Sequence, residues 1–307
     1  MTFDVTILGC GAATPTLRHN PSAQLVNLHD KLFLIDCGEG TQTQLRRYKI
    51  KFQRIEAVFI SHLHGDHYFG LMGLLSSMHL LGRKKAIHLF GPSALKQILD
   101  IQMNVGDMHL SFDIVFHPIN PKTPEIIFED NTIEVSTIPL THRIDCTGFL
   151  FSEKPRPPKV SRNKIAEFNL SLKEIVQLKH GEGVERDGKI IPSNQLTLPQ
   201  APPRRYAYCS DTKPSETVVE LVHGVDLLYH EATFLHVMEK RAKETFHTTA
   251  KQAGEIALRA GVKRLVVGHF SSRYNDDSVI LEEAKSVFEQ TACANEGEVF
   301  SIPLSTL

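Results

Sequence analysis

The chain has 307 residues, of which 41% are hydrophobic and 22% charged, with a formal net charge of −1 at pH 7. This composition is ordinary for a soluble globular protein, and the near-zero charge excludes a protein coated in basic surface. No apolar run approaches the length that crosses a bilayer, and the first residues lack the pattern of a signal peptide. We therefore expect no membrane association and one large or two smaller domains.

Cysteine usage points to a reducing compartment. The five cysteines are scattered, odd in number and without a CxxC pair; they are Cys10, Cys37, Cys146, Cys209 and Cys293. This pattern predicts reduced, mostly buried thiols in a cytoplasmic protein.

Strands lead and helices follow in the first half of the chain. Alternating apolar residues and turn residues predict the boundaries. Strands are expected at 3–8, 23–28, 31–36, 57–60 and 87–90, a helix with a polar capping start at 41–48, a long helix at 67–81, and a further helix capped by Ser93.

The second half repeats this rhythm. Strands are expected at 113–118, 125–128, 132–138, 147–152, 206–209, 225–229, 263–267 and 297–301, and helices at about 248–260 and 277–290. The order favours an α/β (α+β) fold in which two facing mixed sheets are covered by outer helices, a four-layer αββα sandwich formed by a single domain over residues 1–307.

Residues 153–203 differ from the rest of the chain. They contain seven prolines, three glycines and one convincing helical window, Leu170 to Lys179. A polar insertion of this kind between two core strands is expected to protrude rather than to pack. We interpret it as an arm that binds substrate.

The stretch Ser61-His62-Leu63-His64-Gly65-Asp66-His67 carries the chemistry of the chain. It places three imidazoles and a carboxylate directly after an apolar strand, and these ligands suit Zn²⁺, Mn²⁺ and Fe²⁺. In extended backbone His62 and His64 project to one side, and a turn at Gly65 lets Asp66 and His67 face a second point nearby. A closely spaced metal pair of this kind serves hydrolysis. The alternative is a histidine-rich surface turn.

Two metals need more ligands than one turn supplies. His142, Asp211 and His269 each follow a predicted strand, where loops at one end of the sheets bring ligands together. A carboxylate such as Asp211 can bridge two cations. Taken singly, each residue is equally compatible with an ordinary polar loop position.

Two further candidates follow a strand and precede a helix. Glu231, in the pair His230-Glu231, suits a carboxylate that holds a catalytic imidazole, and His247 suits that imidazole. The alternative is that His247 is next to a helix N-cap and takes no part in catalysis.

Basic residues form three runs. A single run is usually only a solvated face, but three runs together with a metal site favour a phosphate-rich substrate. The runs are Arg46, Arg47, Lys49, Lys51 and Arg54; Arg83, Lys84 and Lys85; and Lys154, Arg156, Lys159, Arg162 and Lys164.

Four stretches resemble the ribonuclease Z family of tRNA 3′-processing endonucleases, within the metallo-β-lactamase superfamily. The superfamily signature HxHxDH is specific for fold and metals, and the other stretches narrow the resemblance to the family. They are Asp36–Gln42; Ser61–Leu75, with Met72 where proline is common; the HEAT-type loop His230–Phe234; and Gly268–Tyr274.

The resemblance implies two Zn²⁺ per subunit, with Mn²⁺ or Fe²⁺ as possible substitutes. His62, His64 and His142 would hold one zinc, Asp66, His67 and His269 the other, and Asp211 would bridge them. It also implies that the arm grips precursor tRNA, usually across a homodimer. The arm departs from many bacterial relatives at its tip, where Gln177–Gly183 replaces a Gly-Pro-rich stretch. Its candidate substrate-binding residues are Lys154, Arg156, Lys159, Arg162 and Lys179.

Our hypothesis is a zinc-dependent endoribonuclease that removes the 3′ trailer from precursor tRNA. Asp66 would orient the attacking water and take its proton, and His247, steadied by Glu231, would protonate the leaving 3′ oxygen. The tRNA would keep a 3′-hydroxyl and the trailer a 5′-phosphate. One alternative is a small-molecule phosphodiesterase or arylsulfatase-like hydrolase of the same fold, and another is a catalytically silent RNA-binding protein.

Overall fold

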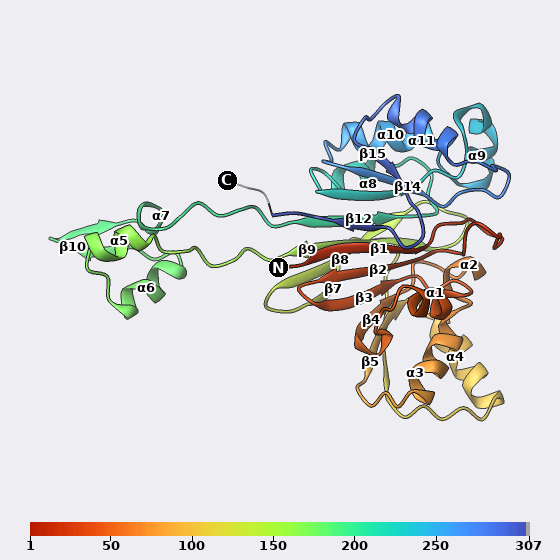
Figure 1. Ribbon diagram of the computed structural model, residues 1–307, viewed down its shortest axis with the longest axis horizontal. Helices are drawn as coiled ribbons and strands as arrows, with labels where there is room; N and C mark the ends of the chain where they lie inside the picture. The colour runs from red at the N-terminus through yellow and green to blue at the C-terminus, as the bar shows by residue number, and fades with distance from the viewer. Residues whose placement is uncertain (305–307) are drawn as a thin grey trace.

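The computed structural model describes residues 1–304, in which two seven-stranded sheets pack face to face with helices on both outer faces. Figure 1 shows the four layers and a long extension that projects sideways from them. The predicted four-layer α/β sandwich is confirmed. Within residues 1–304, no helix is both long and apolar enough to cross a membrane.

The first sheet combines an antiparallel part with a parallel part. Strands from β16 to β3 pair antiparallel, and those from β3 to β6 pair parallel. In spatial order the strands are β16 (Val299–Ser301), β1 (Phe3–Gly9), β2 (Ala23–Leu28), β3 (Lys31–Ile35), β4 (Ile55–Phe59), β5 (Ile87–Gly91) and β6 (Ile114–Pro118). The helices of this half are α1 (Thr41–Arg47), η1 (Phe52–Arg54), α2 (Gly65–Tyr68), α3 (Leu71–Leu80) and α4 (Ala94–Val105).

The second sheet is built in the same way. Its parallel part runs from β12 to β15, and β7, β8, β9 and β12 pair antiparallel. In spatial order the strands are β15 (Thr291–Cys293), β14 (Leu265–Gly268), β13 (Leu227–Glu231), β12 (Arg205–Cys209), β9 (Cys146–Glu153), β8 (Ile133–Leu140) and β7 (Ile126–Glu129). Its helices are α8 (Glu216–Leu221), η2 (His236–Met238), α9 (Glu239–Thr245), α10 (Ala250–Arg259) and α11 (Ser278–Lys285).

Aromatic side chains fill the space between the two sheets. Phe33 and Phe59 of the first sheet contact Phe151 of the second, with ring centroids 5.8 and 5.4 Å apart. These rings are fully buried, and such pairs contribute beyond their buried area. Because side chains alternate along a strand, the other face of each sheet receives helices.

Three details of the helix prediction are wrong. The expected helix 67–81 is two helices, α2 and α3, separated at Phe69-Gly70. A Cβ at Gly70 would lie 2.1 Å from the Gly38 carbonyl oxygen, and the Gly70 N–H donates to the Cys37 carbonyl. This close approach to the loop after β3 interrupts the helix. The expected side-chain caps of α1 and α4, the latter from Ser93, make no capping hydrogen bond.

The extension begins after β9 and returns to β12. Two proline-rich segments lead to a distal body made of α5 (Arg162–Glu167), α6 (Leu172–Lys179), β10 (Val184–Arg186), β11 (Lys189–Ile191) and α7 (Ser193–Leu196). The body has its own small core of Leu170, Leu178, Val184 and Leu196. The expectation of one helical window was incomplete, since two further helices and a hairpin flank α6. In the main body of the fold, strand β15 (Thr291–Cys293) was not predicted from the sequence.

Candidate metal centre

Strand ends bring the candidate residues together at one edge of the sandwich. Six segments that directly follow β3, β4, β8, β12, β13 and β14 converge there, as expected for layered α/β proteins. They carry Asp36, His62 to His67, His142, Asp211, Thr233 and His269 respectively.

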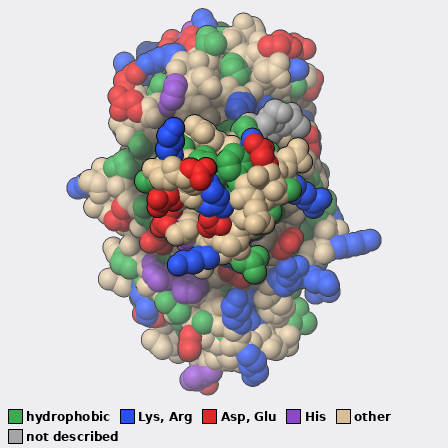
Figure 2. Space-filling view, turned by 90° about the vertical axis from the view of Figure 1, so that its left-hand side faces the viewer, with side chains coloured by type: hydrophobic (Ala, Val, Ile, Leu, Met, Phe, Trp, Pro, Cys, Tyr) green, Lys and Arg blue, Asp and Glu red, His purple; other side chains and the backbone are tan. Residues whose placement is uncertain are grey.

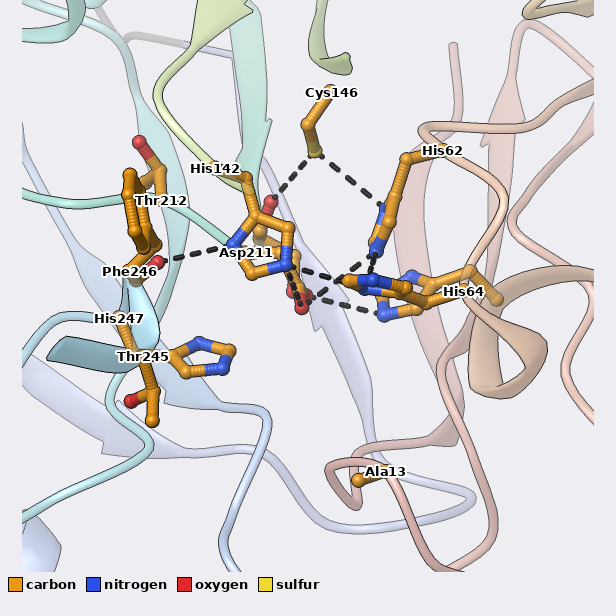
Figure 3. A network of polar contacts seen from close by, with 12 residues as sticks. Ala13, His62, His64, His142, Cys146, Asp211, Thr212, Thr245, Phe246 and His247 are labelled. Atoms are coloured by element: carbon orange, nitrogen blue, oxygen red, sulfur yellow. Dashed lines mark hydrogen bonds and ion pairs between the residues drawn. The ribbon is translucent and has the colours of Figure 1, made fainter. Parts of the chain in front are cut away.

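Three imidazoles form the first cluster. His64 Nδ1 lies 3.0 Å from His62 Nε2 and 3.2 Å from His142 Nε2 (Figure 3). The His142 Nδ1–H donates to the Phe246 carbonyl, so that its Nε2 lone pair faces the other rings. Burial lowers the pKa of all three histidines. Neutral rings of this kind are the form that binds a metal.

A carboxylate and two imidazoles form the second cluster. Asp66 Oδ2 lies 3.4 Å from His67 Nε2 and 3.5 Å from His269 Nε2, and it accepts a hydrogen bond from the Ala13 N–H. Burial alone would lower the pKa of His67, but Asp211, Asp66 and Asp36 raise it well above its ordinary value. The surrounding carboxylates therefore favour positive charge at this point.

Asp211 lies between the clusters and faces both. Its Oδ1 is 3.1 Å from the Nε2 atoms of His67 and His269, and its Oδ2 is 3.7 Å from those of His62 and His142. Burial would raise the pKa of Asp211, but His269, His67 and His62 hold it well below its usual range. An ionised carboxylate with one oxygen on each side is suited to bridging two cations.

The donor set fits metal ions better than it fits hydrogen bonding alone. The Nε2 atoms of His67 and His269 are buried and lack a hydrogen-bond partner among the described residues, and both face Asp66 and Asp211. An unpaired buried polar atom is costly unless something else binds it. The nitrogen separations in the first cluster are also close to the ~3.3 Å between nitrogens on one tetrahedral zinc.

Asp36 is a partner of this site that our reading of the sequence missed. Its Oδ2 accepts hydrogen bonds from His67 Nδ1 at 2.7 Å, from the Tyr208 hydroxyl at 2.7 Å and from Ser61 Oγ at 2.9 Å. Because Nδ1 contacts Asp36, His67 presents Nε2 to the site, the nitrogen that would bind a metal once it is deprotonated. Its position directly after β3, like that of the other site residues, was the available signal.

We expect Asp36→Asn to lower metal affinity by about 10- to 100-fold, the usual effect of losing a carboxylate behind a ligating histidine. Competition with a chelator measures this affinity. Asp30→Asn, in the exposed β2–β3 turn, is the control. An unchanged affinity in Asp36→Asn would show that Asp36 does not orient His67.

Glu231 holds His247 at the side of the pocket. His247 Nδ1 lies 3.0 and 3.1 Å from the two carboxylate oxygens of Glu231, which also accepts a hydrogen bond from Thr233 Oγ1. Burial would lower the pKa of His247, but Glu231 raises it to about 9. The other ring nitrogen is free to face the pocket that His247 lines. Glu231 therefore favours the protonated ring, and a protonated imidazole in this position is suited to donating a proton.

Three of these residues have strained backbone. Asp36, Asp211 and His269 have φ values of 55°, 59° and 60°, in the left-handed region that residues other than glycine rarely adopt. Each lies one or two residues after a buried strand. Strain of this kind gathers at functional sites.

The two clusters open into a cavity of about 650 Å³ whose lining includes three arginines and two phenylalanines. Arg143, Arg241 and Arg273 line it, as do Phe69 and Phe234. The Arg273 guanidinium lies 4.9 Å from the centroid of the Phe234 ring. Our prediction assigned no role to these residues. Phe69, Phe234 and Arg273 lie in the stretches that carry the family resemblance, and Arg143 is next to His142.

The predicted basic residues of the arm lie away from this cavity. Lys154 pairs with Glu129 at 2.7 Å and Arg156 with Glu153 at 2.7 Å, both at the root of the arm. The run 83–85 includes a residue that cannot meet a substrate, because Arg83 is buried and donates to four carbonyl groups. Figure 2, viewed onto the tip of the arm, shows acidic and basic side chains mixed there.

Comparison with known proteins decides the family. The chain is 49% identical over 301 residues to a ribonuclease Z of Bacteroides fragilis (strain YCH46), covering 98% of this chain and 99% of that one. It is 50% identical to a ribonuclease Z of Phocaeicola vulgatus over 98% of this chain and 97% of that one. The chain belongs to the ribonuclease Z family.

The structural likeness agrees with this assignment. The human short-form tRNase Z superposes with a TM-score of 0.72 at 28% identity, over 98% of this chain and all of that chain. A beta-lactamase superfamily domain model matches residues 146–270, and a model of the anti-Pycsar protein Apyc1 matches residues 3–156. The ribonuclease Z relatives, unlike either model, extend over both halves and the arm.

Proposed function

We propose that this protein is a metal-dependent endoribonuclease that removes the 3′ trailer from precursor tRNA. Membership of the ribonuclease Z family over 98% of the chain supports the reaction. The observation that carries the chemistry is Asp211, whose two oxygens face two separate clusters of histidines.

We further propose that the centre takes two Zn²⁺ ions, or Mn²⁺ or Fe²⁺ in their place. His62, His64 and His142 would hold one ion, Asp66, His67 and His269 the other, and Asp211 both. Metal ions in such a pair lower the pKa of water and stabilise the charge that develops on a phosphate. Asp36 and Thr233 would keep His67 and His269 in the tautomers that ligation needs.

Two protein groups would handle protons. The pKa of Asp66 lies far below its usual range despite burial, mainly through His67 and His269, so its carboxylate stays ionised. Asp66 would orient an attacking water and take its proton as the pKa of that water falls on metal binding. His247, protonated beside Glu231, would donate to the leaving 3′ oxygen of the tRNA. Arg143, Arg241 and Arg273, which line the cavity, would bind phosphates of the RNA near the cut.

The ends of the products test the reaction. Incubation with a 3′-extended tRNA transcript should yield a tRNA with a 3′-hydroxyl and a trailer with a 5′-phosphate, because water attacks rather than the RNA's own 2′-hydroxyl. Mass spectrometry of both fragments identifies the ends. A 2′,3′-cyclic phosphate would rule out this mechanism.

Metal analysis alongside the same assay separates the competing functions. A metal-loaded protein that leaves the transcript intact but hydrolyses bis(p-nitrophenyl) phosphate would be a small-molecule phosphodiesterase. A protein that binds tRNA without metal would be a silent binder. The arm and the cationic cavity favour the tRNA enzyme, since a small substrate requires neither.

We propose that residues 153–203 form the arm that contacts tRNA, through Lys154, Arg156, Lys159, Arg162 and Lys179, in a homodimer. The arm's reach from the metal centre supports a long substrate, and its lysines and arginines suit phosphate contacts. A cytoplasmic location fits the free thiols of all five cysteines, four of which are buried. The oligomeric state is measurable by light scattering.

A further inference from the structure

The arm leaves the body of the protein at a buried ion pair. Glu153 is the last residue of β9, and Arg204 directly precedes β12. The two segments of the arm therefore begin at this pair, and both side chains are only 3% exposed. An ion pair is rarely buried so completely, because removing two charges from water is costly.

The contacts of this pair are unusually many. Arg204 donates from its backbone N–H and from Nε to Glu153 Oε2, at 3.1 and 3.0 Å, and from a terminal nitrogen to Oε1 at 2.7 Å. Its remaining donors reach the carbonyl oxygens of Met1 and Ile302. The guanidinium is thus bonded to β9, to Met1 before β1 and to Ile302 after β16.

Further partners hold Glu153 from the other side. His29, in the turn between β2 and β3, lies with Nε2 2.5 Å from Glu153 Oε1, and Arg156 donates to the same oxygen at 2.7 Å. Glu153 therefore connects a turn of the first sheet, two strands of the second and the outgoing segment of the arm.

The stalk beyond the pair has little else to fix its direction. Among the described backbone hydrogen bonds, none joins residues 155–158 to residues 199–203, and pairing resumes only where the Leu198 N–H donates to Lys159. A cavity of about 420 Å³ lies between the two segments. Six prolines stiffen these segments but have no backbone N–H with which to pair one segment with the other. They are Pro155, Pro157, Pro158, Pro199, Pro202 and Pro203.

We propose that the Glu153–Arg204 pair is a positioning element that sets the direction of the arm relative to the metal centre. Its effect on catalysis rests on the proposed function, but its effect on the direction of the arm does not. If the two stiff segments rotate at their base, their far ends are displaced in proportion to their length. Seven extended residues span roughly 20 Å, so an angular play of about 10° displaces the far end by ~3.5 Å, more than a hydrogen bond to a phosphate tolerates.

Distances between spin labels test the mechanical part directly. Labels at Lys189→Cys on the arm and Glu255→Cys on α10, both exposed positions, are measured by electron paramagnetic resonance in a Cys293→Ser background. We expect a narrow distance distribution in the parent protein and at least a doubling of its width in Glu153→Gln. Glu216→Gln, which breaks the exposed Arg259–Glu216 pair on the body, is the control and should leave the width unchanged.

Kinetics test the consequence for substrate. Glu153→Gln should raise KM for a 3′-extended tRNA by about tenfold or more, with kcat and the hydrolysis of bis(p-nitrophenyl) phosphate within twofold of the parent. Arg204→Lys keeps the charge but loses the bidentate contact. Its KM for the tRNA should lie between those of the parent protein and Glu153→Gln. A loss of stability alone would lower activity on both substrates.

Several outcomes overturn the proposal. A broad distribution of label distances in the parent protein would by itself overturn the proposal. A folded Glu153→Gln protein with an unchanged distribution width would also overturn it. If Glu153→Gln does not fold, His29→Asn removes one partner of Glu153 from outside the arm and should broaden the distribution to a smaller extent; no broadening counts against the pair. Failure of the parent to cut tRNA would instead overturn the proposed function and leave the distance result valid.

Discussion

Replacing His247 by alanine should reduce turnover of a 3′-extended tRNA by about 10²- to 10⁴-fold, the range typical for loss of a general acid, while metal content stays at the parental level. The physical reason is the Glu231 carboxylate, which keeps the ring protonated and oriented at the edge of the cavity. Single-turnover cleavage and elemental analysis of the same preparation measure the two quantities.

A ligand role is the alternative that this variant decides. His247, Asp211 and His269 have side-chain atoms within 4.8 Å of one another, so the geometry also permits His247 to bind a metal. A fall in metal content that parallels the fall in activity would assign His247 as a ligand. His109→Ala, whose side chain is 87% exposed, controls for the loss of a histidine as such.

Replacing Asp211 by asparagine should affect both clusters at once. We expect metal content to fall by more than one ion per chain and turnover to fall by at least ~10³-fold, since metal stabilisation of the transition state amounts to several kcal/mol. Asparagine keeps the shape of the side chain but removes the charge that both clusters face. Elemental analysis after gel filtration and the cleavage assay provide the measurements.

A variant that changes only one cluster serves as the comparison for Asp211→Asn. His64→Ala should remove the ion of the first cluster while leaving the contacts of His67 and His269 intact. Asp107→Ala, whose side chain is 95% exposed, should change nothing. Retention of the parental metal content and activity by Asp211→Asn would show that Asp211 does not bridge.

The sequence predicted the architecture because the relevant signals are local. Alternating apolar residues marked the core strands, and polar residues directly after them, such as His142, Asp211 and His269, marked the edge where they meet. The structure brings all seven proposed ligands together at that edge. Their roles as ligands remain the prediction that the variants above test.

What the sequence did not reveal depends on contacts between distant segments. Nothing near Gly70 shows that the Gly38 carbonyl approaches it and separates α2 from α3. Arg83 resembles a surface charge in a basic run, and only the fold surrounds it with carbonyl groups. The partnership of Asp36 with His67 and Tyr208 joins three segments and two sheets, which periodicity along one strand cannot indicate.

The pairing of β16 with β1 has a consequence for how the chain acquires its structure. The first sheet contains β1 (Phe3–Gly9), yet one of its two edge strands is Val299–Ser301. During synthesis from the ribosome, β1 therefore keeps an open hydrogen-bonding edge until residues 299–301 have emerged. An open edge can recruit other strands, and contacts so distant in sequence form slowly. A polypeptide that stops before residue 299 has every proposed metal ligand but lacks the strand that closes this sheet.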